Sequence, residues 1–254
     1  MLIESTRNET VKRVRALAQR KYRLEQGLHF IEGEKLVREA IASGAQIHEA
    51  FVEEGHDIMV AALLGGGTTV YNVNRAVMTS LTLTDTPQWV CATVKMVVHE
   101  IPQHYPAGLI VALDAVQDPG NLGTILRTAD AMGAVGFFVG EGCADPYAPK
   151  PLRAAMGSIY HLPVWQGDLH NEIFRLREQG FTLVCGHLRG KSELPDVNER
   201  CLLIIGNESN GVSDEIAAQC YKYKLPMYGV AESLNASVAA GIMINEFAKV
   251  LHMG

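Results

Sequence analysis

The sequence predicts an α/β protein in two parts, with the larger, C-terminal part built on a parallel sheet. From residue 109 onward, short apolar runs alternate with segments of helical periodicity, the pattern of strands joined by crossover helices. The apolar runs are nearly uninterrupted, as expected of strands covered on both faces. Before them, HEIPQHYPAG (99–108) holds two prolines and a glycine and predicts a linker. We therefore expect a smaller α/β domain over 1–98 and a second domain over 109–254.

The composition is that of a globular protein without a membrane span. The chain has 254 residues, 48% of them hydrophobic and 20% charged. No run approaches about 18 apolar residues and the N-terminus lacks a signal-peptide pattern, so a cytoplasmic protein is expected. Five cysteines without a C-x-x-C pair favour reduced thiols. No His or Cys cluster has metal-ligand spacing, so no protein-bound metal is expected.

Apolar periodicity in the N-terminal part predicts two longer helices, two strands, two short helical pieces and a glycine turn. The longer helices are expected over 8–25 and 33–43, and the strands over 47–53 and 89–96. The short helical pieces are expected over 57–64 and 74–80, and the turn over 65–69. The same reading of the C-terminal part predicts four strands, over 109–114, 135–140, 181–187 and 201–206. The helices are expected over 121–133, 149–158, 168–179, 212–220 and 236–250.

A stripe of basic residues lies on the first predicted helix, although the formal net charge of the chain is −6. It contains seven Lys or Arg and one acid, Glu9. Clustered cations of this kind are typical of a surface that contacts RNA phosphates, and a solvated helix face is the equal alternative. The seven residues are Arg7, Lys12, Arg13, Arg15, Arg20, Lys21 and Arg23.

The loops that follow the C-terminal strands are the places to look for a site, because ligands bind beyond the carboxyl ends of parallel strands. Four such loops are DAVQDPGN (114–121), GEGCADPY (140–147), GHLRG (186–190) and GNESNG (206–211). None completes the glycine pattern of a dinucleotide site or of a phosphate-binding loop, and no G-x-S-x-G elbow is present. Nicotinamide, nucleoside triphosphate and serine hydrolase chemistry are therefore weakly supported.

Three loop–helix units carry clustered polar residues. In the first, Asn121 lies at or near a helix N-cap and Arg127 follows within two turns. In the second, a strand delivers Asn207 and Glu208 into a tight loop, and in the third Ser233-Leu234-Asn235 opens the final helix. Taken singly, these residues also fit structural roles: Asn121 and Ser233 as caps, Arg127 as an ion-pair partner of Asp130, and Glu208 as a solvated acid.

In this order, DPGNLGTILRTADAMG, IIGNESNGVS and LPMYGVAESLNASVAAGI resemble the three motifs of the SpoU group of RNA ribose 2′-O-methyltransferases, in the SPOUT superfamily. STRNETVKRVRAL and GLHFIEGEKLVREAI resemble the L30e-like substrate-binding domain often fused to that group. The resemblance implies a C-terminal trefoil knot, S-adenosyl-L-methionine as methyl donor, and a homodimer through the knotted domain. The expected substrate is a ribose of structured RNA, rRNA rather than tRNA.

The resemblance also implies roles for individual residues. The catalytic set it implies is Asn121, Arg127, Glu208, Ser233 and Asn235, and the cofactor set is Gly206, Asn207, Leu225, Pro226, Met227 and Leu234. A guanidinium is a poor general base, so we interpret Arg127 as a group that binds phosphate or ribose, or stabilises an oxyanion, in either subunit of the dimer. Two alternatives remain open: an RNA-binding protein of the same fold without catalysis, and an oxidoreductase on an ordinary doubly wound sheet.

Overall fold

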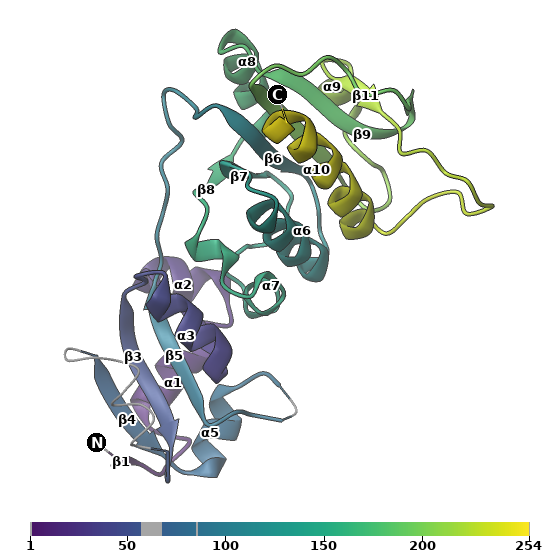
Figure 1. Cartoon of the computed structure of the whole chain (residues 1–254). Coiled ribbons are helices and arrows are strands. Elements are labelled where there is room, and N and C mark those ends of the chain that lie inside the picture. Colours follow the sequence, from purple (N-terminus) through teal and green to yellow (C-terminus); the bar gives the residue numbers. More distant parts are fainter. Residues whose placement is uncertain (1, 57–67, 85, 254) are drawn as a thin grey trace. The chain divides into compact units, whose positions relative to one another are not determined.

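The computed structural model of the chain describes residues 2–56, 68–84 and 86–253 and divides into two compact units (Figure 1). The first unit comprises Met1–Val97 together with Tyr147–Tyr160, and the second comprises Val98–Pro146 and His161–Gly254. Tyr147–Tyr160 thus belongs to the first unit, although strands of the second unit flank it in sequence. The helical piece expected over 57–64 and most of the turn expected over 65–69 lie outside the described residues.

The first unit is built on a five-stranded mixed sheet with the strand order β1-β4-β3-β5-β2. β3 runs parallel to β4 and antiparallel to β5. The strands are β1 (Leu2–Ile3), β2 (Leu28–Glu32), β3 (Ile47–Glu53), β4 (Thr69–Val73) and β5 (Val90–Lys95). The helices are α1 (Glu9–Ala16), α2 (Arg20–Gln26), α3 (Glu34–Ala42), α5 (Arg75–Leu81) and α7 (Pro149–Ala155), followed by the 3₁₀ turn η1 (Ser158–Tyr160).

The predicted helix over 8–25 is wrong in one respect, because the chain forms two helices there. Between α1 and α2, Leu17 is fully buried and Arg23 is 2% exposed. The Arg23 guanidinium donates to the carbonyl oxygens of Leu17 (2.6 Å) and Ala18 (2.9 Å). These carbonyls would point into the next turn of an uninterrupted helix, so the side chain stabilises the break by satisfying them. The predicted helices over 33–43 and 74–80 and both predicted strands are confirmed.

The second unit is built on a six-stranded sheet in which every neighbouring pair is parallel, with the strand order β11-β9-β10-β6-β7-β8. The four predicted strands are confirmed, and two short edge strands are added. The strands are β6 (Gly108–Asp114), β7 (Gly136–Gly140), β8 (Val164–Gly167), β9 (Thr182–Lys191), β10 (Arg200–Gly206) and β11 (Tyr221–Tyr223). The helices are α6 (Pro119–Ala131), α8 (Leu169–Glu178), α9 (Asp214–Ala217) and α10 (Ala236–Met253).

Helices cover this sheet in two groups. Leu169, Ile173 and Leu176 of α8 pack with Ile110 and Phe138 of the sheet in one buried cluster. α10 packs instead against α6, β6 and β10, and Figure 1 shows α6 and α10 together in front of the sheet. Among the described residues, no helix is long and apolar enough to cross a membrane.

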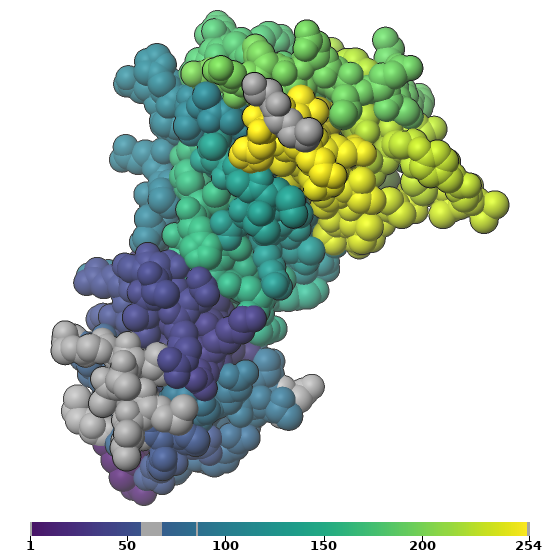
Figure 2. Space-filling view, in the orientation of Figure 1, coloured from purple at the N-terminus to yellow at the C-terminus, as the bar shows by residue number. Residues whose placement is uncertain are grey.

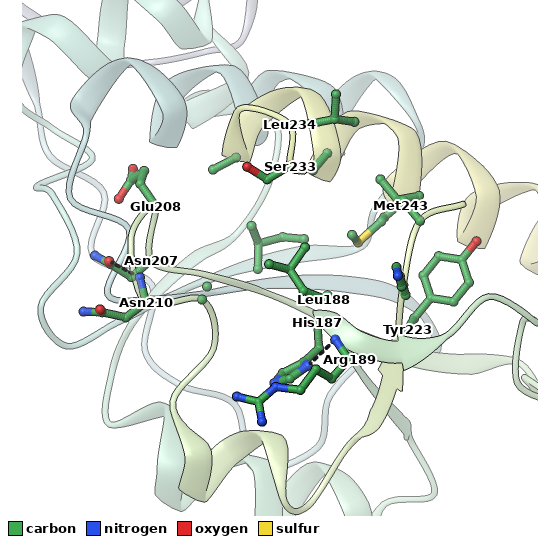
Figure 3. Close-up of a pocket in the computed structure, with 18 of the residues that line it drawn as sticks. His187, Leu188, Arg189, Asn207, Glu208, Asn210, Tyr223, Ser233, Leu234 and Met243 are labelled. Carbon is green, nitrogen blue, oxygen red and sulfur yellow. Dashed lines mark hydrogen bonds between the residues drawn. The ribbon is translucent and has the colours of Figure 1, made fainter. Parts of the chain in front are cut away.

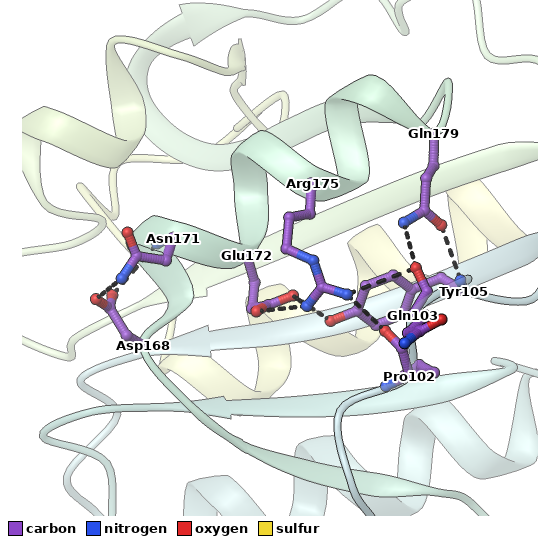
Figure 4. A network of polar contacts seen from close by, with 8 residues as sticks. All are labelled: Pro102, Gln103, Tyr105, Asp168, Asn171, Glu172, Arg175 and Gln179. Atoms are coloured by element: carbon purple, nitrogen blue, oxygen red, sulfur yellow. Dashed lines mark hydrogen bonds and ion pairs between the residues drawn. The ribbon is translucent and has the colours of Figure 1, made fainter.

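The segment expected as a linker, 99–108, has no helix or strand before β6 but is fastened to α8 (Figure 4). The Tyr105 hydroxyl, which is buried with its ring, donates to the Glu172 carboxylate (2.6 Å). Arg175 donates to Glu172 as well and to the carbonyl oxygen of Pro102 (2.8 Å). Gln179 accepts from the backbone N–H of Tyr105 (2.8 Å). The connecting segment therefore follows a defined path over the second unit.

Candidate active site

A cavity of about 350 Å³ lies at the carboxyl ends of β9 and β10, within the range of small-molecule sites. Four segments enclose it: the end of β9, the loop after β10, the chain between β11 and α10, and the first turns of α10. Figure 3 shows the loop of Asn207 and Glu208, the strand residues His187 and Arg189, and Ser233 around the cavity. The site therefore occupies the position expected for a parallel sheet.

Seven of the predicted site residues line this cavity. They are Gly206, Asn207, Leu225, Met227 and Leu234 from the cofactor set, and Glu208 and Ser233 from the catalytic set. Pro226, Asn121, Arg127 and Asn235 do not line it. The lining residues without a predicted role include Gly186, His187, Leu188, Arg189, Tyr223, Ala239 and Met243. The first four belong to GHLRG (186–190), which was expected as a loop with a site but lies within β9 (Thr182–Lys191). Met243 belongs to an apolar run that reads as helix core.

One chain of hydrogen bonds joins the three polar motifs at this cavity. The Glu208 carboxylate accepts from the backbone N–H groups of Gln117 (3.1 Å) and Asp118 (3.0 Å) and from the Asn121 side-chain amide (3.0 Å). Asn121 in turn accepts, through its side-chain carbonyl, from the Asn235 amide (3.1 Å). The three motifs are therefore held together by hydrogen bonds between the side chains of Glu208, Asn121 and Asn235.

Asp118 caps α6 and Asn235 caps α10, so neither Asn121 nor Ser233 has the cap role that was its structural alternative. α6 begins at Pro119 and Asp118 caps it, accepting from the Asn121 backbone N–H (2.8 Å), so Asn121 is not the cap. Asn235 precedes α10 and accepts from the N–H groups of Ser237 (2.9 Å) and Val238 (3.3 Å). Within the described part of the chain, the Ser233 side chain has no hydrogen bond to the start of α10. Its hydroxyl is left exposed at the cavity.

The loop after β10 is shaped by its own backbone. Asn207 and Gly211 exchange two backbone hydrogen bonds of 2.9 Å each, and Gly211 has a φ of +72°, which favours glycine. A Cβ on Gly206 would meet the backbone of Gly211 and Val212. The Asn207 side chain accepts from the N–H groups of Ser209 and Asn210 and so closes the turn. This turn orients the Glu208 carboxylate toward Asn121.

Two titratable groups at the cavity have shifted pKa values. Burial acts to raise the pKa of Glu208, but the hydrogen bonds from Asn121 and the backbone outweigh it, and the net pKa is lowered. Burial, with Lys222 and Arg189 nearby, lowers the pKa of His187. The His187 Nδ1 accepts from the Arg189 backbone N–H (3.0 Å), so its neutral ring carries the proton on Nε2. Glu208 is thus anionic near neutral pH and a weak proton acceptor.

Arg127 is an exposed residue of α6 with no hydrogen bond or ion pair in the described part of the chain. The alternative role as a partner of Asp130 is wrong, because the Asp130 carboxylate binds the His161 Nδ1 instead (2.7 Å). The guanidinium is therefore available to a ligand that approaches α6 from outside.

Some basic residues of the stripe are buried or paired with carboxylates, and others are exposed and could contact RNA. Arg23 is buried, and Arg13 is held by two contacts to the buried Glu49 carboxylate (2.7 and 2.6 Å). Lys12 pairs with Glu9 (2.7 Å) and Lys21 with Glu25 (3.8 Å), both at exposed positions. Among the described residues, the side chains of Arg7 and Arg15 have neither a hydrogen bond nor an ion pair. We therefore leave Arg23 out of any RNA surface.

The cavity fits the methyl donor that the resemblance implies. Of the described residues, those from Leu225 to Leu234 form no backbone–backbone hydrogen bond, so their N–H and C=O groups remain available to read an adenine edge. The lining side chains include apolar Leu225 and Leu234 and charges of both signs, such as Glu232 and Arg189. S-adenosylmethionine has a flat base, a carboxylate and two cationic centres, and this set of groups complements it.

Comparison with known proteins gives a consistent result. Residues 108–245 match the SpoU rRNA Methylase family, and residues 8–92 match the MRM3-like substrate binding domain. The 23S rRNA (guanosine(2553)-2′-O)-methyltransferase of Bacillus subtilis is 35% identical over 245 residues, which cover 95% of this chain and 97% of that protein. The 23S rRNA (uridine(2479)-2′-O)-methyltransferase of Streptomyces viridochromogenes is 36% identical over 148 residues, 54% of this chain and 50% of the relative.

Solved structures agree with this assignment. The AdoMet-bound rRNA methyltransferase of Sinorhizobium meliloti superposes with a TM-score of 0.87 at 34% identity, covering 98% of this chain and 97% of that one. The SpoU methyltransferase AviRb of Streptomyces viridochromogenes, in complex with AdoMet, also gives 0.87, at 28% identity over 98% of this chain and 100% of that one. The ordered motifs, the parallel sheet and these matches together show that the chain belongs to the SpoU family of S-adenosylmethionine-dependent RNA 2′-O-methyltransferases.

Proposed function

We propose that this protein methylates the 2′-oxygen of one ribose in 23S rRNA. The observation that carries the proposal is the hydrogen-bonded chain from Glu208 through Asn121 to Asn235 at the mouth of the cavity. It joins the three family motifs and leaves Ser233 and Arg127 with free polar groups. The names of the two 23S rRNA methyltransferase relatives support rRNA as the substrate class. The cytoplasm, where ribosomal RNA is made, suits five free cysteines.

The cavity residues hold the methyl donor in this proposal. When bound, S-adenosylmethionine supplies an activated methyl group for in-line attack by the ribose oxygen. Backbone groups between Leu225 and Leu234 bind the adenine edge, and the side chains of Leu225 and Leu234 shield its faces. The Glu208 network fixes the start of α6 and the start of α10, so the walls of the site are set before RNA arrives. Such positioning contributes about 7–11 kcal/mol in well-oriented reactions.

Arg127 and Ser233 are the groups we assign to the RNA. Arg127 binds a phosphate or stabilises the ribose oxygen as its proton leaves to solvent, because a guanidinium donates hydrogen bonds and keeps its charge. The Ser233 hydroxyl donates to or accepts from the ribose at the cavity. Glu208 is not the base, since N–H donors already occupy both of its oxygens.

We further propose that the protein is a homodimer in which Arg127 of one protomer completes the site of the other. Arg127 does not line the cavity of its own chain. Exposed apolar side chains lie near it at the end of α6 and along α10: Met132 (37% exposed), Val238 (51%) and Ile242 (41%). Figure 2 shows α10, in yellow, beside α6, in teal, on an open face. A second copy would cover this face. The C-terminal knot implied by the resemblance stays a prediction.

The test of activity uses Arg127→Ala and Asn235→Ala, with tritium-labelled methyl transfer to undermethylated 23S rRNA. Both changes are expected to lower kcat about 100-fold or more, the loss typical of removing one preorganised donor. Arg127→Ala should keep its affinity for S-adenosylmethionine in calorimetry, because Arg127 lies outside the cavity. Arg177→Ala, an exposed arginine of α8, is the matched control and should transfer normally. Label found on bases, or undiminished transfer, would overturn the proposal.

Mixing the two inactive variants tests the shared site. If Arg127 acts on the partner's cavity, a heterodimer of Arg127→Ala and Asn235→Ala contains one intact site and one doubly altered site. Activity should then return on mixing, to about a quarter of the wild-type value for random exchange between dimers, where half of the dimers are mixed. If Arg127 serves its own cavity, no intact site forms and mixing restores nothing.

A further inference from the structure

A second cavity, of about 400 Å³, is lined by residues of the first unit. It is bounded by the end of α1, β2, the end of α5 and Pro149 at the start of α7. Every lining residue except Pro149 falls within residues 8–92, the part that matches the MRM3-like substrate binding domain. The cavity is therefore a property of the first unit alone.

The floor of this cavity is apolar and its rim is polar. Val14, Phe30 and Leu81 are buried residues of the floor. Two hydroxyl groups also belong to lining residues: half-buried Ser80 donates to the Val77 carbonyl oxygen (2.8 Å), and buried Thr82 donates to the Met78 carbonyl oxygen (3.1 Å). Each hydroxyl has only one hydrogen and donates it to that carbonyl, so only its lone pairs remain for a ligand, as acceptors.

Arg15 supplies a cation at the same rim. It is exposed and, in the described part of the chain, has no hydrogen bond or ion pair. Its neighbours on α1 differ, because Lys12 pairs with Glu9 and Arg13 with Glu49. An available guanidinium beside an apolar floor and two acceptors complements a molecule with a phosphate, a flat apolar face and N–H or O–H donors. A single nucleotide has all three.

We infer that this cavity binds one unstacked nucleotide of the RNA substrate, with Arg15 on its phosphate. The base lies against the apolar floor, and Ser80 and Thr82 accept from its amino group or from the ribose hydroxyl. Proteins that recognise RNA commonly bind bases splayed out of single-stranded loops in this way. The inference rests on the proposed function, since it assigns to the first unit a recognition step for the RNA that the second unit methylates.

Arg15→Ala and Arg7→Ala make a matched pair for the first test. Both side chains are exposed and have neither a hydrogen bond nor an ion pair to any described residue, and each change removes one positive charge, but only Arg15 lines the cavity. The general loss of phosphate attraction is therefore equal. Filter binding of undermethylated 23S rRNA to the full chain should show about tenfold weaker binding for Arg15→Ala than for Arg7→Ala, the loss of a charged hydrogen bond. Equal affinities would overturn the inference.

Filling the cavity gives the second test. Thr79 is an exposed lining residue, so Thr79→Trp should block the cavity without disturbing the core, whereas Thr79→Val keeps the shape. Thr79→Trp should raise KM for 23S rRNA about tenfold, with unchanged affinity for S-adenosylmethionine, and Thr79→Val should not. An effect of both variants, or of neither, contradicts a cavity that holds a nucleotide.

A third measurement separates this inference from the proposed function. Millimolar AMP, CMP, GMP and UMP are titrated into the ¹⁵N-labelled full chain, and amide shifts are expected at Arg15, Ser80 and Leu83 for at least one of them. Shifts absent there, or found only elsewhere, overturn the nucleotide site even if the wild-type protein methylates 23S rRNA. Absence of methyl transfer by the wild-type protein instead overturns the proposed function, whatever the nucleotides do.

Discussion

Glu208 acts in this structure as a fixed acceptor and not as a proton acceptor for the reaction. Both of its oxygens accept N–H donors from the loop before α6 and from Asn121. Hydrogen bonds to the charged form favour it, which accounts for the net lowering of the pKa of Glu208 in spite of partial burial. The residue therefore places Asn121, and through it Asn235, beside the cavity, and we propose that it serves methyl transfer in this way.

Glu208→Gln tests this role. A glutamine presents one oxygen and one NH₂ group, and the NH₂ group would face a backbone N–H, so the loop before α6 should loosen. We expect kcat to fall at least about tenfold, with a loss of stability of up to about 1 kcal/mol at neutral pH, because the position is exposed. Methyl transfer and urea unfolding measure the two effects. Glu232→Gln, which changes a cavity acid without a hydrogen bond, should keep wild-type stability.

The pH dependence of Glu208 follows from the direction of its shift. A carboxyl whose folded-state pKa is lowered stabilises the fold above its ordinary value of 4.5, and this contribution is lost as the pH falls below that value. Wild-type protein should therefore lose more stability than Glu208→Gln as the pH falls below about 4.5. If the free energies of unfolding of the two proteins fell in parallel with pH there, the hydrogen bonds to Glu208 would not favour its charged form.

At this scale the sequence brought seven of the residues predicted for the site to one cavity, but it did not predict the hydrogen bonds between the motifs. The structural alternative for Asn121 was a helix cap, because asparagine near the start of a helix often caps it. The structure gives the cap to Asp118 and makes Asn121 a bridge between Glu208 and Asn235, which are 87 and 114 residues away in sequence. Local spacing predicts caps, whereas a bridge depends on how distant loops meet.

Among the elements, β10 and its loop depend on Gly206 lacking a side chain. A Cβ there would meet backbone atoms of Gly211 and Val212, which cannot rotate away as a side chain can. Gly206→Ala should therefore displace the loop and lower the affinity for S-adenosylmethionine at least about tenfold, or 1.4 kcal/mol, measured by calorimetry. Gly229→Ala is the control, because a Cβ at Gly229 meets nothing within 4 Å. Equal affinities for the two variants would contradict the close approach.

A second prediction at the scale of elements concerns the contact between the connecting segment, 99–108, and α8. Tyr105→Phe removes the donor to buried Glu172 and should lower the free energy of unfolding of the second unit by about 1.5–3 kcal/mol, the usual value for a hydrogen bond to a charged group. Trp165 stacks edge-on with Tyr105 and reports on this unit in a Trp89→Phe background. Tyr221→Phe, which removes an exposed bond to the Glu193 carbonyl oxygen, should cost less than about 0.5 kcal/mol.

Strand prediction succeeded where the signal was long and apolar, as in β6, β7, β9 and β10. In the second unit it missed β8 and β11, which have four and three residues and lie at the edges of the sheet. In the first unit it missed β1, β2 and β4, which have two, five and five residues. Such short segments carry too few residues to show a period. The break between α1 and α2 was missed for another reason, since it depends on Arg23 reaching back to two carbonyl groups.

At the scale of the whole molecule, the chain does not divide where its composition changes. Tyr147–Tyr160 belongs to the first unit although it lies between β7 and β8 of the second. The Tyr160 hydroxyl bonds His29 of β2 (2.8 Å), and the Arg153 guanidinium pairs with Glu32 (3.1 Å). These contacts span more than 100 residues, so a local reading of the sequence had no means of predicting them.

His29 makes the first unit sensitive to acid. It is fully buried against the rings of Tyr147 and Tyr160, and burial, with a smaller contribution from Arg23, lowers its pKa to about 3. A histidine held neutral in the fold destabilises it at low pH, because the unfolded chain takes up a proton below about 6.5 that the folded chain cannot. Stability is therefore retained above that value and lost between pH 6.5 and about 3.

The effect of His29 is measured by urea unfolding between pH 4 and 7, with Trp89 as the reporter in a Trp165→Phe background. Near pH 5, His29 should contribute a slope of about 1.4 kcal/mol per pH unit. His29→Gln can keep the hydrogen bond to Tyr160 but does not titrate, so its slope should be shallower by that amount. His48→Gln removes an exposed histidine of β3 and should keep the wild-type slope. Identical slopes for all three proteins would mean that His29 takes up its proton without unfolding the unit.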